Sequence, residues 1–243
     1  MDLATYATEA EAEATHWWFV GRRRLFAREI DKAGVPRTSR VLDVGTSTGA
    51  NLRLLRDLGF HSIEGLDFSQ EAIRYCRTKG LGLVRHGDVC GMPLTDESFD
   101  LLLATDIIEH VDDDLAALRE IARVLRPGGK ALITVPAFPM LWGLQDRIGQ
   151  HKRRYRMRQL VDRVTRAGLS IDVNYHFNFL LFIPIWLGRR LIDLARPDIQ
   201  NEAQINSPLL NRVLTAVFFV DIATAPLLRV PFGVSILLVA TKK

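Results

Sequence analysis

Short apolar runs alternate with amphipathic segments along the chain from about residue 40 onwards. The runs 40–44, 62–66 and 99–104 are rich in branched aliphatic residues, which is typical of buried strands. Segments 51–58 and 70–79 between them are followed closely by glycines, as helices often are. This alternation predicts an α/β domain with a mostly parallel sheet and helices on both of its faces.

The same pattern continues to the end of the chain, so we expect a Rossmann-like sheet of seven strands. Segment 112–125 shows the helical spacing, because Leu115, Leu118 and Ile121 share one face between an acidic start and a Pro-Gly-Gly end. The remaining predicted elements are a helix at 158–167 and strands at 83–85, 131–135, 169–174 and 234–240.

One stretch interrupts this rhythm before the last strand. Residues 177–232 hold two apolar segments, 179–187 and 213–228, separated by a polar piece. We expect neither to span a membrane, because the first is short and the second contains Asp221 and Pro226. A helical insertion of this kind could line an apolar pocket, rest on a membrane, form a dimer interface or add a packed layer.

The N-terminal part of the chain precedes the first predicted strand. Residues 1–37 are expected to form a helical lid on the domain at 38–243, with one helix at 9–32. This helix carries a His-Trp-Trp-Phe cluster followed by three consecutive arginines. Trp18 could contact the substrate and exclude water, or it could pack the helix against the sheet.

Composition narrows the class of protein without naming a function. With 48% hydrophobic and 25% charged residues, the 243-residue chain is typical of a globular protein. Its net charge of +4 is small, and no basic stretch interleaved with aromatic residues favours nucleic-acid binding. Two cysteines without a paired spacing and an acidic start without an apolar h-region predict a cytoplasmic protein, with contact to the inner face of the membrane left open.

A glycine-rich turn after the first predicted strand carries the most specific chemistry. Residues 41–51 read Val-Leu-Asp-Val-Gly-Thr-Ser-Thr-Gly-Ala-Asn. A dinucleotide-binding turn would have glycine at the positions of Ser47 and Ala50, and the carboxylate of Asp43 would repel a pyrophosphate. The turn therefore suits a cofactor that carries a positive ammonium group and no phosphate.

This turn resembles motif I of the class I S-adenosylmethionine-dependent methyltransferases, and the resemblance extends over roughly residues 38–175. Runs resembling that family's approaches to strands four and five follow in order, at 92–100 and 125–130. Ser47 departs from the glycine often found at its position, but it is small enough to be tolerated. The resemblance implies S-adenosylmethionine as the cofactor.

The resemblance also implies which side chains hold this cofactor. It places Asp67 on the ribose hydroxyls, Phe68 beside the adenine and Asp88 on the adenine amino group. The full set assigned to cofactor binding is Asp43, Gly45, Thr46, Ser47, Gly49, Asp67, Phe68, Asp88, Val89 and Thr105.

The end of the fourth predicted strand places three polar side chains beside the cofactor. Asp106, Glu109 and His110 lie at i, i+3 and i+4, so on a helical turn they share one face. His110 could act as a general base for a hydroxyl acceptor, and Asp106 is a second catalytic candidate. The three groups could instead hold a divalent cation with a further histidine, or form an ordinary turn, and we assign no residue to a metal.

A basic run after the fifth strand resembles the His-x-Arg-Arg-aromatic run of some methyltransferases of this type. His151 is expected to accept a proton, while Arg153, Arg154 and Tyr155 are expected to bind a carboxylate or phosphate of the substrate. The alternative is a solvated basic start of a helix, although cations are unfavourable there unless an anion is near.

Together these features predict methyl transfer to a small, lipid- or glycan-linked, anionic acceptor, with oxygen as the expected methylated atom. Two alternatives stay open: a catalytically inactive cofactor-binding partner or scaffold of the same fold, and a nicotinamide-dependent oxidoreductase. The expected partners are the acceptor itself, a membrane surface contacted through 177–232, and a second copy of the chain forming a homodimer.

Overall fold

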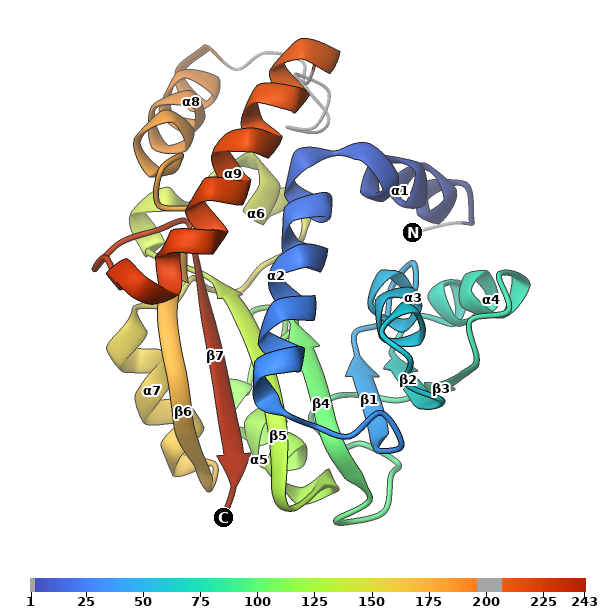
Figure 1. Ribbon diagram of the computed structural model, residues 1–243. Coiled ribbons are helices and arrows are strands. Elements are labelled where there is room, and N and C mark those ends of the chain that lie inside the picture. The colour runs from blue at the N-terminus through green and yellow to red at the C-terminus, as the bar shows by residue number, and fades with distance from the viewer. Residues whose placement is uncertain (1–2, 196–206) are drawn as a thin grey trace.

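The computed structural model describes residues 3–195 and 207–243, and it confirms the expected α/β architecture (Figure 1). The described residues form a seven-stranded sheet in the order β3-β2-β1-β4-β5-β7-β6. β7 runs antiparallel to its two neighbours, and the other neighbouring pairs are parallel. The middle of the predicted insertion, residues 196–206, lies outside the described residues.

The predicted strands are all present, with ends that differ by a few residues. β5 differs most, because it begins at Leu125, which pairs with Phe99 across an irregularity in the ladder. The strands are β1 (Arg40–Val44), β2 (Ser62–Asp67), β3 (Leu83–His86), β4 (Phe99–Thr105), β5 (Leu125–Pro136), β6 (Leu169–Phe177) and β7 (Ser235–Lys242).

Helices cover both faces of the sheet and bury an apolar cluster on each. On one face, α5 (Asp114–Val124) and α7 (Met157–Arg166) pack against the central strands. On the other face, α2 (Trp17–Ala33), α3 (Ala50–Asp57) and α9 (Pro208–Leu228) do so. Helix α4 (Gln70–Thr78) lies beside the edge strand β3. The central strands are thus shielded from water on both sides, as a parallel sheet requires.

The prediction of a single N-terminal helix at 9–32 is wrong. The structure has two helices, α1 (Leu3–Thr15) and α2, that meet at His16, whose backbone is extended (φ −68°, ψ 132°). The His16 side chain accepts a hydrogen bond from the backbone N–H of Trp18 and so caps α2. The sequence on both sides of His16 has helical character, so the cap formed by His16 is the feature that separates the two helices.

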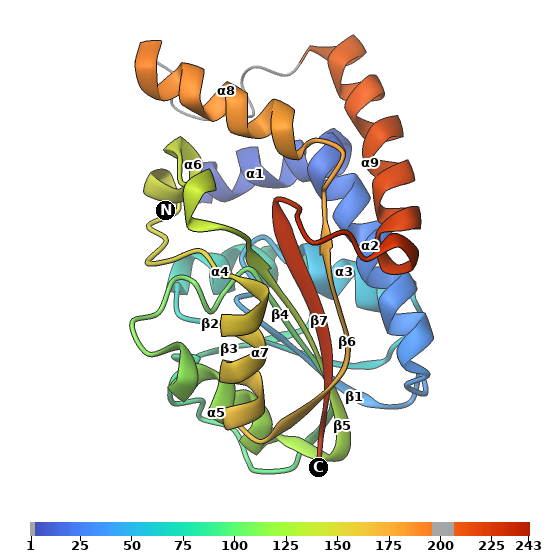
Figure 2. The same cartoon turned by 90° about the vertical axis from the view of Figure 1, so that its left-hand side faces the viewer.

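Three helices lie beyond the carboxyl ends of the parallel strands, where ligands bind in open α/β sheets (Figures 1 and 2). They are α1, the short α6 (Leu144–Ile148) and α8 (Phe182–Ala195). The sequence did not predict α6. A single 3₁₀ turn, Pro139–Leu141, precedes it after β5.

Helix α9 is long and apolar enough to cross a membrane by length and composition, although Asp221 and Pro226 led us to expect otherwise. In the structure its buried residues, among them Phe218 and Ile222, pack in the cluster formed with α2 and the sheet. The Asp221 carboxylate accepts hydrogen bonds from the backbone N–H groups of Asn178 (2.6 Å) and Leu180 (2.7 Å). Asp221 therefore ties α9 to the turn that follows β6.

Candidate active site

The glycine-rich turn joins β1 to α3 and takes backbone conformations that few residues adopt. Gly45 (φ 73°) and Gly49 (φ 81°) lie in the left-handed region, and Ser47 (φ 47°) joins them there despite its side chain. The Ser47 backbone N–H donates to the Asp67 carboxylate at the end of β2 (2.8 Å). This bond holds the turn against the neighbouring strand, so the two predicted cofactor contacts form one unit.

Asp43 lies at the base of this turn and is fully buried. Its Oδ1 accepts a hydrogen bond from Asn51 (2.9 Å), which also donates to the Thr105 hydroxyl (3.0 Å), whereas Oδ2 is buried without a partner among the described residues. Burial raises the pKa of Asp43 to about 7, and the nearby charge of Asp67 adds to the rise. A cation bound beside the turn would stabilise the ionised form of Asp43.

The adenine end of the predicted site lies at the carboxyl ends of β2 and β3. The Phe68 side chain is 72% exposed, and its ring lies 5.8 Å from the ring of His86. Asp88 is exposed and uses one oxygen to accept from the backbone N–H of Cys90 (2.8 Å), while Val89 is buried. Phe68 and Asp88 follow the ends of two paired strands, so this edge of the sheet offers a stacking surface and a hydrogen-bond acceptor.

Beyond β4, Asp106 receives contacts from two other elements. Its Oδ2 forms an ion pair with Arg22 of α2 (2.6 Å), and its Oδ1 accepts from the Thr134 hydroxyl of β5 (3.1 Å). Its backbone is also left-handed (φ 54°). Residues held in such conformations gather at functional sites, where the surrounding structure must keep them there.

The other two polar residues of this turn meet a residue that comes much later in the chain. The rings of His110 and His151 lie 4.6 Å apart, edge to face. Burial, and then the neighbouring His151, lower the pKa of His110. Glu109 is fully buried, and both of its carboxylate oxygens lack a hydrogen-bond partner among the described residues. Burial, followed by the charge of Asp106, raises the pKa of Glu109 well above its ordinary value.

Asp146 of α6 orients His151, with which it forms a 2.8 Å contact between the carboxylate and Nδ1. Asp146 is fully buried and also accepts hydrogen bonds from Arg154 (2.8 Å) and the backbone N–H of Gly143 (2.9 Å). Burial alone would raise its pKa, but the hydrogen bonds with His151 and Arg154 and the charge of Arg154 hold the pKa at about 2. A charged carboxylate thus fixes the ring of His151.

The three residues predicted to bind an anionic substrate make contacts within the chain. Arg154 is buried and donates to Asp146 and to the carbonyl of Ala137. Tyr155 is fully buried, and its hydroxyl donates to Asp114 (2.9 Å). Arg153 donates to two backbone carbonyls and pairs with Asp114 (3.3 Å). The structure brings His151 to the strand-four turn, whereas these three residues contact Asp114, Asp146 and backbone carbonyls.

Trp18, the other predicted substrate residue, packs between elements. Its ring stacks on Phe177 of β6 and Phe218 of α9, with centroids 6.0 and 5.4 Å away. The Arg22 guanidinium lies 5.4 Å from the same ring. Trp18 thereby places Arg22 opposite Asp106, a positioning effect that the sequence did not reveal.

Helix α1 contacts the cofactor turn directly, which sequence reasoning also missed. Buried Glu13 accepts a hydrogen bond from the Thr48 hydroxyl (2.5 Å) and pairs with Arg53 (3.1 Å). The Tyr6 hydroxyl donates to the Ser69 hydroxyl (3.0 Å) at the start of α4. In an acidic N-terminal segment nothing distinguishes Glu13 from its solvated neighbours, so no local signal could have found it.

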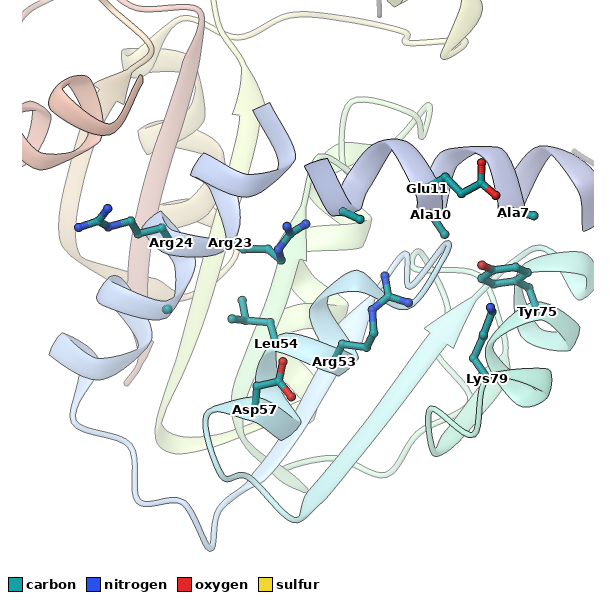
Figure 3. A pocket seen from close by; sticks show the side chains of 12 residues that line it. Ala7, Ala10, Glu11, Arg23, Arg24, Arg53, Leu54, Asp57, Tyr75 and Lys79 are labelled. Carbon is teal, nitrogen blue, oxygen red and sulfur yellow. The ribbon is translucent and has the colours of Figure 1, made fainter. Parts of the chain in front are cut away.

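A pocket of about 680 Å³ lies beside this contact, beneath α1 and between α2, α3 and α4 (Figure 3). Arg23 and Arg53 reach into it from α2 and α3, and Tyr75 and Lys79 line its other end. It contains none of the residues predicted for the cofactor or the substrate. The pocket therefore lies between α1 and the helices beneath it, apart from the polar side chains at the ends of β1 and β4.

Comparison with known proteins identifies the turn and the strands around it. The family model described as a methyltransferase domain matches residues 42–133. A Mycolicibacterium smegmatis protein named a probable S-adenosylmethionine-dependent methyltransferase is 34% identical over 97 residues, which cover 40% of this chain and 37% of that protein. The demethylmenaquinone methyltransferase of Staphylococcus aureus is 30% identical over 129 residues, which cover 48% of this chain and 54% of that protein.

Solved structures share the fold over most of the chain. An S-adenosylmethionine-dependent methyltransferase from Mesorhizobium loti matches 87% of this chain and 95% of its own with a TM-score of 0.58 at 17% identity, a likeness that shows the fold alone. The chain spans about half or less of the length of the relatives given above. The expected fold is confirmed, and the residues that the family model matches include most of the glycine-rich turn.

Proposed function

We propose that this chain, which carries a class I S-adenosylmethionine-dependent methyltransferase domain, moves a methyl group from that cofactor to a hydroxyl of a small or lipid-linked acceptor. The observation that carries the proposal is the acidic glycine turn, where Asp43 is buried with one oxygen left without a partner. An anionic, phosphate-repelling turn fits a cofactor that bears an ammonium group and a sulfonium.

The described residues fit this cofactor at each end of the turn. Asp67 accepts one backbone hydrogen bond on each oxygen, so each oxygen keeps a lone pair for a ribose hydroxyl. Phe68 offers an exposed face for the adenine, and Asp88 has an oxygen available for its amino group. The cofactor, when bound, supplies a methyl group activated by a positively charged sulfur.

The side chains beyond β4 support oxygen as the atom that is methylated. A hydroxyl acceptor must lose a proton, and His110 and His151 lie together at this edge of the sheet. The lowered pKa of His110 keeps it neutral at physiological pH, as a proton acceptor must be. Alignment of the acceptor with the methyl group would then supply much of the rate.

The surface of α8 supports an apolar or lipid-linked acceptor. Ile183, Leu187, Leu191 and Leu194 recur at helical spacing and are between 48% and 83% exposed. Since α8 lies beyond the strand ends (Figure 2), an apolar chain bound along this stripe would be close to the methyl-transfer site. A cytoplasmic protein resting on the inner membrane face would have access to such acceptors. The anionic acceptor expected from Arg153 and Arg154 lacks this support.

The direct test is transfer of a labelled methyl group from S-adenosylmethionine to molecules extracted from bacterial cells, separated into lipid and aqueous fractions. Wild-type protein should label the lipid fraction, and Asp67→Ala should label neither fraction. Asp162→Asn, an exposed position on α7, should behave like wild type. Binding of the cofactor without label in either fraction would support the inactive cofactor-binding alternative instead.

The proposed contact of α8 with a membrane is tested separately, by sedimenting the protein with vesicles of anionic phospholipid. Leu187→Glu with Leu191→Glu should reduce the bound fraction at least fivefold, because two charges then lie on the apolar stripe. Leu83→Glu, at an exposed position of β3, is the matched control and should leave the bound fraction unchanged. Equal sedimentation of all three proteins would remove the membrane from the proposal.

A further inference from the structure

We propose that Glu109, His110 and His151 bind one divalent transition-metal ion, such as Mn²⁺ or Zn²⁺, beside the methyl-transfer site. The three residues each present one ligand atom, and these atoms lie within 4.8 Å of one another. Metal–nitrogen and metal–oxygen bonds measure about 2.0–2.2 Å, so two ligands on opposite sides of an ion are about 4.2 Å apart. Small rotations of the side chains therefore bring all three into bonding distance.

Glu109 supplies the independent observation that a ligand belongs here. Its side chain is fully buried, and neither carboxylate oxygen has a hydrogen-bond partner among the described residues. Burying an unpaired carboxylate is costly, so such groups are normally paired or coordinate a metal. Arg22 and Arg154, whose charges act on Glu109, are paired with Asp106 and Asp146. A bound cation would supply the missing partner.

The second ligand is already oriented. Asp146 accepts hydrogen bonds from Arg154 and the backbone of Gly143, so its carboxylate acts as an acceptor and His151 must donate from Nδ1. Nε2 of the same ring then carries the lone pair. A carboxylate behind a histidine is the usual arrangement of a metal-binding imidazole, because it fixes the tautomer and the ring plane. Asp146 is thus a positioning residue for this site.

The backbone holds the two parts of the cluster in register. The N–H of Lys152 donates to the carbonyl of Glu109 (2.7 Å), which links the loop after α6 to the turn after β4. Tyr155 of the same loop bridges to Ala137 at the end of β5. Because these are main-chain bonds, the arrangement of His151 against Glu109 and His110 does not depend on the ion itself.

The donor set indicates which class of ion binds. Two imidazole nitrogens and one carboxylate suit first-row transition ions and zinc, whereas Mg²⁺ and Ca²⁺ prefer sites made of oxygen atoms alone. Three protein ligands leave positions for water or a substrate oxygen, as in catalytic metal sites. Through such a position the ion would lower the pKa of an acceptor hydroxyl. Once bound, the ion replaces the two imidazoles as the group that activates the hydroxyl, because a ligated ring nitrogen can no longer accept a proton. This role in methyl transfer rests on the proposed function, whereas binding of the ion does not.

The test is a titration of tag-free, chelator-treated protein with Co²⁺, followed by the visible ligand-field absorption. Wild type should bind one equivalent, and excess Zn²⁺ should abolish the signal while millimolar Mg²⁺ should not. Glu109→Gln, His110→Ala and His151→Ala should each weaken binding at least tenfold. Glu109→Gln is the main variant because it keeps the shape of a buried side chain and removes the carboxylate that would bind the ion.

Matched controls and one further variant complete the experiment. Glu71→Gln and His61→Ala change the same residue types outside the cluster and should bind Co²⁺ as wild type does. Asp146→Asn should weaken binding about 10- to 100-fold and change the absorption bands, since an outer carboxylate sets ligand orientation. Absence of one-equivalent binding, or equal loss in His61→Ala, would overturn the site.

Cofactor affinity is measured on the same samples so that the two proposals fail separately. S-adenosylhomocysteine binding should survive Glu109→Gln within about threefold and also reports that the variant is folded. Cofactor binding without Co²⁺ binding would sink the cation site and leave methyl transfer standing. Co²⁺ binding without cofactor binding would overturn the proposed methyl transfer and leave the cation site standing.

Discussion

The guanidinium of Arg22 on α2 lies 2.6 Å from the carboxylate of Asp106, directly beyond the end of β4. The pair joins the N-terminal helices to the carboxyl edge of the sheet, and it is half-buried, with side chains 14% and 27% exposed. Stacking on Trp18 and Phe26 fixes the guanidinium from behind. The charge at the proposed methyl-transfer edge is therefore balanced by a residue of the predicted lid.

Loss of this arginine should change how the site distinguishes the charged cofactor from its neutral product. Arg22→Gln leaves Asp106 unneutralised, which should favour the sulfonium of S-adenosylmethionine over the thioether of S-adenosylhomocysteine. A unit charge a few ångströms away is worth about 1 kcal/mol in a half-exposed site, or roughly a fivefold change in the affinity ratio. Titration calorimetry with both ligands measures it. Arg24→Gln, on the same helix, should leave the ratio as it is.

Asp67 should be the most sensitive single position for cofactor affinity. Asp67→Ala removes the acceptor for the ribose hydroxyls and also frees the backbone N–H of Ser47, so the glycine turn loses one of its hydrogen bonds to β2. We expect S-adenosylhomocysteine to bind at least tenfold more weakly, the loss of about one charged hydrogen bond. Unchanged affinity, with Asp162→Asn as the matched control, would contradict the placement of the ribose.

Asp43 should make the stability of the cofactor-free protein depend on pH. Its pKa is raised to about 7, above the ordinary value of 3.8 in the unfolded chain. The unfolded state therefore releases this proton first, and stability falls as pH rises from about 4 to about 7, by up to about 1.4 kcal/mol per pH unit. Asp43→Asn should lack this part of the slope in urea unfolding between pH 5 and 8. Asp57→Asn, at an exposed position, should keep it.

The same group should give cofactor binding the opposite dependence on pH. The ionised form of Asp43 favours the cationic ligand, so the affinity of wild type for S-adenosylmethionine should rise between pH 6 and pH 8. Asp43→Asn should show a flatter profile over that interval. Parallel profiles for the two proteins would mean that Asp43 does not sense the bound cation.

Gly21 should be required for the contact between α2 and α9. A Cβ atom at this position would lie 2.1 Å from the ring of Phe218, which is itself held by Trp17 and Trp18. Gly21→Ala should therefore lower the free energy of unfolding by about 1–3 kcal/mol, despite the better helix propensity of alanine. Gly188→Ala on α8 meets nothing within 4 Å and should be neutral or slightly stabilising. Thermal unfolding of both variants checks the difference.

Most of the sheet could be predicted from the sequence because its elements are decided locally. Buried parallel strands show continuous apolar runs, and Val41 and Leu101 lie in such runs. Amphipathic helices show apolar residues at a 3.6-residue period, as around Leu118, and are often followed by glycine. The cofactor turn is equally local, since Asp43, Gly45 and Gly49 lie within one loop. Their spacing and charge identify the class of ligand without any knowledge of distant contacts.

The acceptor side was decided by contacts between segments far apart in the chain. Arg22 meets Asp106, and His151 meets His110, only after the helices and loops have packed. The sequence predicts that His151 and the arginines after it act together on the substrate. In the structure Arg154 is buried and donates to Asp146. A local pattern states which side chains are available, but not which buried partner each will find.

What the sequence by itself determined was therefore the seven strands, the main helices between them and the character of the proposed cofactor turn, because these follow from hydrophobic periodicity and backbone freedom over a few residues. The tertiary structure alone decided the break at His16, the placement of α1 over the turn through Glu13, and the grouping of Glu109 with two histidines. The burial of Glu13 and of Glu109 depends on desolvation, and a charge is desolvated only when elements distant in sequence close around it.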